Sequence, residues 1–181
     1  RAEAATVSRV VIDFDETVGD RFALDNIIGD NTNISFDELA TAPVDGLSVD
    51  GVTFGFQGGG LPSADAVFAA FDLTPIGPMT FLDGNILEGS ALGILTLDFA
   101  VPTSFLSFGF ALNGDAQLPV PGAVVSLFDA ANRLIGSFTV DVFATQTAIG
   151  FPEGLFEYSI AAVPVPAALP LFVIALAGLG L

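Results

Sequence analysis

Short segments in which apolar and polar residues alternate run through most of this 181-residue chain, and clusters of Gly, Pro, Asn and Asp separate them. A repeat of two residues places successive side chains on opposite faces of a strand, so each segment predicts a strand with one buried face. In residues 9–14, for example, Val10, Ile12 and Phe14 share one face. About eight to ten such segments, with no long helical pattern before residue 163, predict an all-β protein, specifically an antiparallel β-sandwich or jelly roll.

The expected strands are bounded by turn residues. Residues 64–73 fit either a short helix or a strand, and the neighbouring segments favour a strand. Residues 15–46 are rich in Asp, Asn, Gly and Thr, which predicts a long ordered loop with short strands at 21–24 and 34–36. The other expected strands are 9–14, 52–56, 92–101, 104–112, 124–128, 134–142 and 155–160.

The composition excludes several classes of protein. Twenty-one acidic residues against four basic ones give a net charge of −17, and all four basic residues are arginine. A nucleic-acid-binding protein needs a basic face to displace counterions from phosphates, so nucleic acid is not an expected partner. The chain also lacks Cys and His. This excludes disulfides, thiolate chemistry, Ser-His triads and zinc sites of the usual kind.

The last part of the sequence differs from the rest, because residues 167–181 carry no polar side chain. As a helix this segment would span roughly 22 Å, against about 30 Å for the hydrocarbon core of a bilayer. We expect a hydrophobic, transmembrane-like anchor helix, and the alternative is a buried C-terminal helix of the core. The expected anchor residues are Leu169, Leu171, Phe172, Val173, Ile174, Leu176, Leu179 and Leu181. Gly178 and Gly180 would allow close contact with a neighbouring helix.

The chain is therefore expected to have four parts. Residues 1–8 are a lead-in, 9–160 the sandwich domain, 161–166 a Pro-rich linker and 167–181 the anchor helix. The opening residues Arg1 to Ala5 are compatible with the start of a mature exported chain whose leader has been removed.

Two regions resemble a known class of exported proteins of Gram-negative bacteria. The stretch from Val163-Pro164-Val165-Pro166 to Phe172, followed by residues 176–181, resembles the PEP-CTERM sorting signal in its Val-Pro-x-Pro variant. The body is similar to the sandwich domains that often precede this signal, in residues 11–15, 51–54, 104–110 and 125–138. The resemblance implies export by a signal peptide, temporary anchoring by the tail, processing by an exosortase and often a surface or matrix role. It implies no particular biochemical activity.

Oxygen-bearing side chains gather near the first expected strand and in the segment after it. Ca²⁺ takes about six to eight oxygen ligands, and the expected set is Asp13, Asp15, Glu16, Asp30 and Asn31. The EF-hand spacing is not met from Asp13 or Asp30, so a site would be built from loops distant in sequence. The alternative is that these are solvated loop residues and that the chain binds no cofactor.

These observations lead to one expected function and an alternative. We expect a non-enzymatic exported protein at the periplasmic or outer face of a bacterial membrane. There it would act as a structural or accessory subunit of a membrane-bound or cell-surface assembly, with lipid, integral membrane proteins or copies of itself as partners. The alternative is a calcium-dependent module that binds carbohydrate, polysaccharide or matrix. A pair of carboxylates such as Asp13 and Asp15 could serve a hydrolase, but in so acidic a chain chance explains this pairing.

Overall fold

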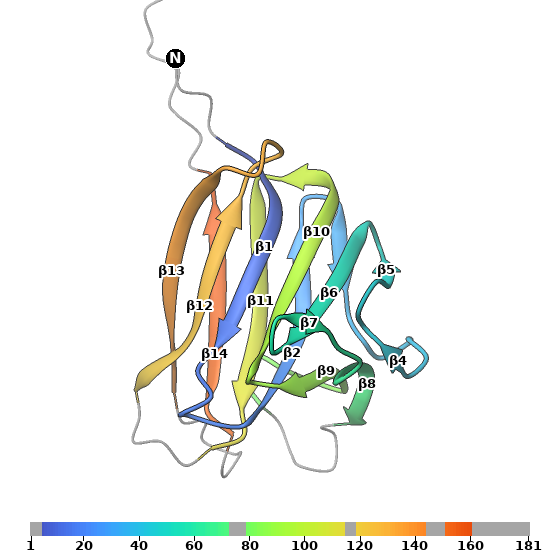
Figure 1. Ribbon diagram of the computed structural model, residues 1–181, viewed down its shortest axis with the longest axis vertical. Helices are drawn as coiled ribbons and strands as arrows, with labels where there is room; N and C mark the ends of the chain where they lie inside the picture. The colour runs from blue at the N-terminus through green and yellow to red at the C-terminus, as the bar shows by residue number, and fades with distance from the viewer. Residues whose placement is uncertain (1–4, 73–78, 115–118, 144–150, 161–181) are drawn as a thin grey trace, which may run out of the picture.

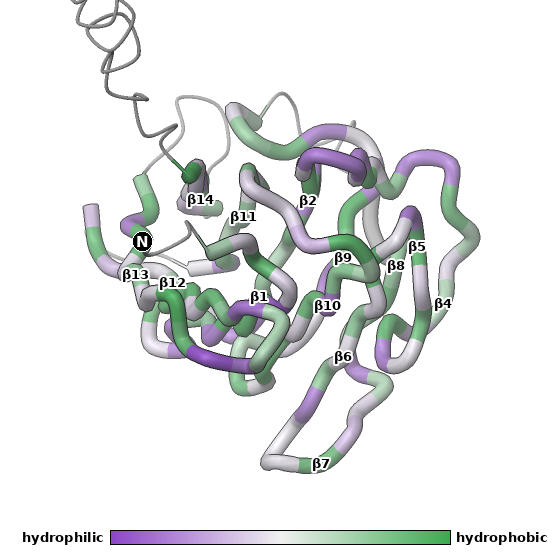
Figure 2. Tube along the Cα trace, turned by 90° about the horizontal axis from the view of Figure 1, so that it is seen from above, coloured by the Kyte–Doolittle hydropathy of each residue, from purple (hydrophilic) through white to green (hydrophobic). Residues whose placement is uncertain are grey.

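The computed structural model describes residues 5–72, 79–114, 119–143 and 151–160. Fourteen strands within these ranges form two sheets of seven strands, and neighbouring strands pair antiparallel. Figure 1 and the perpendicular view in Figure 2 show the two sheets packed face to face. The predicted all-β fold with an antiparallel β-sandwich is confirmed.

The first sheet has the order β13-β12-β1-β10-β6-β5, with β7 beside β6. Its strands are β1 (Val7–Phe14), β5 (Ser48–Val49), β6 (Val52–Gly58), β7 (Leu61–Pro62), β10 (Gly93–Thr103), β12 (Val120–Phe128) and β13 (Leu134–Val142). The β6–β7 hairpin projects away from the body of the sandwich (Figure 2).

The second sheet has the order β14-β11-β2-β9-β8-β4, with β3 beside β2. Its strands are β2 (Arg21–Gly29), β3 (Thr32–Ile34), β4 (Ala42–Pro43), β8 (Ala66–Asp72), β9 (Asn85–Ser90), β11 (Phe105–Leu112) and β14 (Glu153–Ser159). β2 lies near the centre of this sheet, so the segment predicted as a long loop in fact supplies one of its main strands.

The core lies between the sheets and is rich in phenylalanine. Alternate residues of the central strands are buried, as the period-two pattern predicted: Val10 and Ile12 on β1, and Phe108 and Phe110 on β11. Phe14 stacks on Phe22 across the two sheets, with ring centroids 4.1 Å apart. The fully buried large side chains are Phe22, Phe36, Phe54, Phe56, Phe68, Phe108, Phe110, Ile12, Leu24, Ile27, Ile34 and Leu87.

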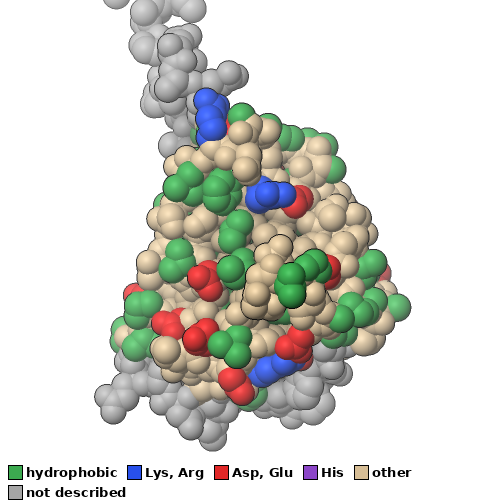
Figure 3. Space-filling view, viewed as in Figure 1, with side chains coloured by type: hydrophobic (Ala, Val, Ile, Leu, Met, Phe, Trp, Pro, Cys, Tyr) green, Lys and Arg blue, Asp and Glu red, His purple; other side chains and the backbone are tan. Residues whose placement is uncertain are grey.

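The outer face of the first sheet carries few charges. The outward positions of β1, β10 and β12 hold apolar side chains such as Ile94 and Val124 and short hydroxyl side chains such as Thr96 and Ser126. Its ion pair joins Arg9 and Asp98 on adjacent strands, with 2.6 Å between Nε and Oδ1. Figure 3 shows this face, where hydrophobic and uncharged surface predominates and acidic side chains gather toward the lower part of the view.

The strand order places the two ends of the described chain at one end of the sandwich. β1 begins where β14 ends (Figure 1), and the N–H of Ile160 donates a 2.9 Å hydrogen bond to the carbonyl of Ser104 at the start of β11. The expected linker at 161–166 and anchor helix at 167–181, with the anchor residues named above, lie outside the described residues. Within the described ranges no helix has the length and hydropathy of a membrane span.

Candidate functional site

Residues 79–85, here called the strap, lead into β9, which begins at Asn85, and lie across the outer face of the second sheet. The strap covers Gly109 of β11 so closely that a Cβ at this position would overlap the carbonyl of Phe81. Leu82 of the strap forms a small hydrophobic cluster with Ile86 and Ala111, outside the main core. The strap thus gives the second sheet a partly covered outer face.

Carboxylates hold the strap by its main chain. Glu153 of β14 is fully buried and accepts hydrogen bonds of 2.9 Å from the N–H groups of both Thr80 and Phe81. Asp37 accepts a hydrogen bond of 2.7 Å from the N–H of Asn85. Hydrogen bonds to charged acceptors contribute more than neutral ones, so these contacts fix both ends of the strap.

A β-bulge in β2 presents a third carboxylate to the strap. The register between β2 and β11 shifts between the pairs Gly109–Asp25 and Ser107–Ile28. Asn26 adopts a positive φ of 53° there. The extra residue lets Leu24 and Ile27 both face the core, which leaves Asp25 on the outer face beneath the strap.

Asp25 is only 1% exposed. Its Oδ2 accepts a 3.0 Å hydrogen bond from the N–H of Asp83, and its Oδ1 is buried with no hydrogen-bond partner. Burial raises the pKa of Asp25 from 3.8 to about 7, and the neighbouring Asp83 carboxylate adds to this rise against the opposing effect of the backbone hydrogen bonds.

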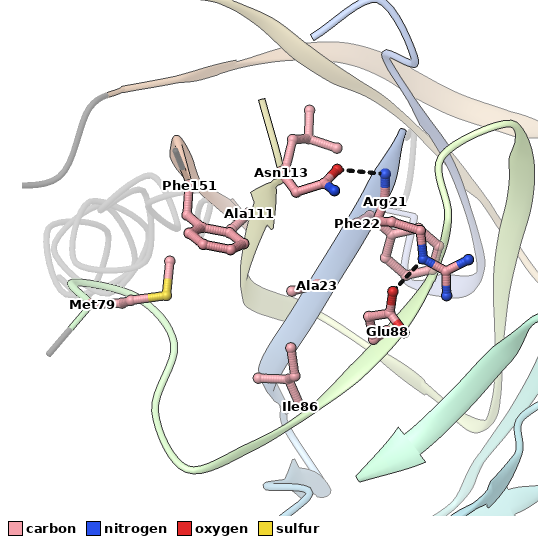
Figure 4. A pocket seen from close by; sticks show the side chains of 10 residues that line it. Arg21, Phe22, Ala23, Met79, Ile86, Glu88, Ala111, Asn113 and Phe151 are labelled. Carbon is pink, nitrogen blue, oxygen red and sulfur yellow. Dashed lines mark hydrogen bonds and ion pairs between the residues drawn. The ribbon is translucent and has the colours of Figure 1, made fainter. Parts of the chain in front are cut away.

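A pocket of about 250 Å³ opens beside the strap on the same outer face. Met79 and Phe151 lie on one side of the pocket, and the charged side chains of Arg21 and Glu88 lie on the other. Ala23 and Ala111 lie between these two sides (Figure 4). The small alanine side chains on adjacent strands leave the space that larger residues would fill. The residues lining the pocket are Arg21, Phe22, Ala23, Met79, Ile86, Glu88, Ala111, Leu112, Asn113 and Phe151.

The polar wall of the pocket is centred on Arg21. Its Nε is paired with Glu88 of β9, and its Nη1 lies 3.0 Å from Oδ1 of Asp65. The hydrogen bond to Glu88 is the main cause that raises the Arg21 pKa above its usual value, so the guanidinium stays charged. Asn113 accepts a 2.7 Å hydrogen bond from the N–H of Arg21 through its Oδ1, which leaves its amide NH₂ group as a donor for a ligand. The pocket combines an apolar floor with an aromatic ring and polar groups, as small-ligand sites commonly do.

Asp13, Asp15 and Glu16 lie together at the end of β1, around a shallow hollow that Thr17 and Val124 also line. Oδ1 of Asp15 accepts hydrogen bonds from the N–H and the hydroxyl of Thr17, at 2.9 and 2.6 Å. This part of the expected calcium set is brought together in space, with one carboxylate oxygen already used locally.

Asp30 and Asn31 lie at the opposite end of the sandwich, in the turn after β2. Oδ2 of Asp30 accepts hydrogen bonds from the N–H and the hydroxyl of Ser104, at 2.6 and 2.8 Å. These hydrogen bonds lower the pKa of Asp30 below its usual value. The structure therefore separates Asp30 and Asn31 from Asp13, Asp15 and Glu16, and these five residues do not form one site. Within the described ranges, no three His, Cys, Asp or Glu side chains are placed to hold a metal ion.

Sequence reasoning did not identify the pocket or the buried acid Glu153, and it counted Asp25 among the oxygen-bearing residues of a predicted loop, whereas the structure buries it in β2. Asn26, at the bulge, carried the one usable signal, because an Asp-Asn pair that interrupts an alternating segment is a common sign of irregular backbone. Comparison of the chain with protein-family models, with curated proteins and with solved structures found no match.

Proposed function

We propose that this chain is a non-catalytic exported protein whose sandwich is held at a bacterial membrane by its C-terminal apolar segment. It would serve there as a structural or accessory subunit of a membrane-bound or surface assembly. The observation that carries the proposal is the contrast between two parts of the chain. The buried core residues of the described ranges run from Val7 to Phe156 and come from the strands and loops of one sandwich, whereas residues 167–181 are apolar throughout.

The position of Ile160 supports the same proposal. Ile160 lies beside the start of β11, where its N–H bonds to the carbonyl of Ser104, and the pocket residue Asn113 directly follows the other end of that strand. Eight extended residues span roughly 27 Å. A membrane anchor that follows residue 160 would thus leave the pocket at the far end of the sandwich, open to the aqueous side.

The composition supports a non-catalytic role. Without His, Cys or Lys, the chain lacks the side chains that most often act as general bases or covalent nucleophiles near neutral pH. The chain is acidic overall, but the outer face of its first sheet carries few charges. Such a face suits a subunit that is held in place by its anchor and presents a sheet to partners.

The experiment compares membrane association of the full chain with that of anchor variants, each expressed behind an export leader in a Gram-negative host. Two arginines, at Leu171 and Ile174, should cost about 2.5–3.5 kcal/mol each at the centre of a membrane helix. We expect the wild type in the membrane fraction after a high-salt wash and Leu171→Arg/Ile174→Arg in the soluble fraction. The matched control Leu171→Ala/Ile174→Ala should remain with the membrane. If the arginine variant fractionates like the wild type, the tether is not the apolar segment. If the arginine variant instead unfolds, the segment belongs to the core; a cooperative thermal transition equal to that of the wild type checks this point.

A second candidate function is the binding of carbohydrate or matrix material in the pocket. The observation in its favour is the Phe151 ring, which faces a wall carrying Arg21, Glu88 and Asn113 (Figure 4). Aromatic faces and planar polar groups together suit a sugar ring. Retention on immobilised polysaccharides should fall in Phe151→Ala and persist in the control Phe143→Ala, whose side chain is exposed outside the pocket. Equal retention of the two variants would place glycan binding elsewhere.

A further inference from the structure

Three oxygen atoms from β2 and the strap converge on one atom, Nδ2 of Asn26. They are Oδ2 of Asp25 at 3.1 Å, Oδ1 of Asp83 at 3.1 Å and the main-chain carbonyl of Phe81 at 3.4 Å. An amide nitrogen carries two hydrogens, so at least one of them is shared between two of these acceptors. The cluster therefore has more acceptor oxygens than Asn26 has N–H bonds.

A second, independent observation concerns Asp25. Its Oδ1 is buried without a hydrogen-bond partner, although the residue is 99% removed from solvent, with 1% exposed. A charged, buried carboxylate with one oxygen unpartnered is costly unless a positive group compensates it. The four ion pairs in the described part of the chain involve other acids, and none includes Asp25 or Asp83. The protein side chains around this carboxylate do not supply the missing positive charge.

Rotation of the Asn26 amide by half a turn exchanges its nitrogen and its oxygen. Oδ1 of Asn26 would then take the place of the nitrogen, about 3.1 Å from one carboxylate oxygen of Asp25 and one of Asp83 and about 3.4 Å from the Phe81 carbonyl. Oxygens bound to Ca²⁺ at about 2.3–2.6 Å lie about 3 Å from one another, which matches the separations found here. We propose that Asp25, Asn26, Asp83 and the Phe81 carbonyl form a Ca²⁺ site that ties the strap to β2.

The donor set favours Ca²⁺ over Mg²⁺. Carboxylate, side-chain amide and main-chain carbonyl oxygens in an irregular arrangement are typical of calcium, whereas Mg²⁺ keeps several waters and a near-ideal octahedron. Asp83 is exposed, so water can reach that side of the ion and complete its coordination. The ion would supply the charge that the buried Asp25 lacks. The site is separate from the sets at Asp15 and Asp30.

Calcium titration of the purified, chelator-treated full chain tests the proposal, by isothermal calorimetry and by the thermal transition with and without CaCl₂. We expect one saturable site and a higher melting temperature with Ca²⁺. Asp83→Asn removes one charge at an exposed position and should weaken Ca²⁺ binding by about tenfold or more, as ligand charge sets affinity in such sites. Asp15→Asn makes the same chemical change after the end of β1, in the other sheet, and should bind Ca²⁺ like the wild type.

Asp25→Asn should abolish the thermal shift produced by Ca²⁺. If that buried substitution prevents folding, the comparison of Asp83→Asn with Asp15→Asn decides alone. Three results would each overturn the proposal: no saturable Ca²⁺ binding, Ca²⁺ affinity in Asp83→Asn equal to that of the wild type, or Mg²⁺ binding more tightly than Ca²⁺.

Discussion

Glu153 and Phe81 lie far apart in the sequence, yet Oε1 of the fully buried Glu153 accepts a 2.9 Å hydrogen bond from the N–H of Phe81. The other carboxylate oxygen accepts from the N–H of Thr80. In Glu153→Gln one of these oxygens becomes an NH₂ group that faces an N–H donor. We expect a loss of about 1–3 kcal/mol in the free energy of unfolding, measured by urea denaturation. The control Glu157→Gln, exposed on the same strand, should stay within about 0.5 kcal/mol of the wild type; equal losses would mean that the strap contact contributes nothing.

The raised pKa of Asp25 predicts a pH-dependent stability in calcium-free buffer. The pKa is about 7 in the folded protein against 3.8 as the ordinary value, so the folded state binds more protons between these two pH values. Stability should therefore fall as the pH rises from about 4 to about 7 and level off above that. Asp25→Asn lacks the titrating carboxyl group, so its stability should not show this fall. The free energy of unfolding of Asp25→Asn, relative to that of the wild type, should therefore be higher at pH 8 than at pH 4.5, by on the order of a few kcal/mol. Melting temperatures at both pH values in chelator check this, with the exposed Asp13→Asn as the control for net charge. A constant difference between Asp25→Asn and the wild type at the two pH values would contradict the raised pKa.

Close packing at Gly109 predicts that a single methyl group there displaces the strap. A Cβ at this position overlaps the main chain of Phe81, which cannot move without breaking its hydrogen bond to Glu153. Gly109→Ala should cost about 1–3 kcal/mol, seen as a lower melting temperature. Gly58→Ala is the matched control, because a Cβ there would meet only Ser63 atoms at 3.5 Å. Wild-type stability of Gly109→Ala would show that the strap can shift freely.

The two cross-strand arginine pairs should differ in strength. Arg21 and Glu88 are 35% and 27% exposed, whereas Arg9 and Asp98 are 45% and 41% exposed. A double-mutant cycle with Arg21→Met and Glu88→Gln should give a coupling energy near the upper end of the roughly 0.2–1 kcal/mol range for such pairs. The Arg9–Asp98 cycle should lie near the lower end and shrink further in high salt. Equal coupling energies would argue against an effect of the pocket wall on the first pair.

Alternation in the sequence was enough to predict most of the sandwich. The alternation in residues 92–101 puts Leu95, Leu97, Phe99 and Val101 on one face of the strand. The first three face the core from β10, whereas Val101 is exposed. Residues 66–72 form a strand as expected. The first strand, predicted at 9–14, begins two residues earlier, at Val7.

The second sheet was harder to predict, for a local reason. The bulge at Asp25 and Asn26 breaks the alternation of β2, so only its first residues, 21–24, were recognised as a strand. β9, Asn85–Ser90, was missed because Asn, Glu, Gly and Ser dominate its six residues.

The carboxylates around the strap could not be predicted as a group from the sequence, because the strand order alone brings them together. Asp25 and Asp83 are 58 residues apart along the chain, and Glu153 contacts main-chain amides, which leave no residue-specific signal. The expected calcium ligands came from two groups of oxygen-bearing residues, at 13–16 and 30–31, and the turn after β2 carries Asp30 to the opposite end from Asp15.

The strap is secured through its peptide N–H groups, at Thr80, Phe81, Asp83 and Asn85. At Thr80, Phe81 and Asp83 this attachment does not depend on side-chain identity, provided that none becomes proline, whereas Asn85 also donates from its side chain to the carbonyl of Asp37. An engineer could exchange the exposed Thr80 for a fluorophore-bearing or cross-linkable residue and retain the anchorage of the segment. The sandwich thereby offers a place to attach a label close to the pocket without redesigning the sheet beneath it.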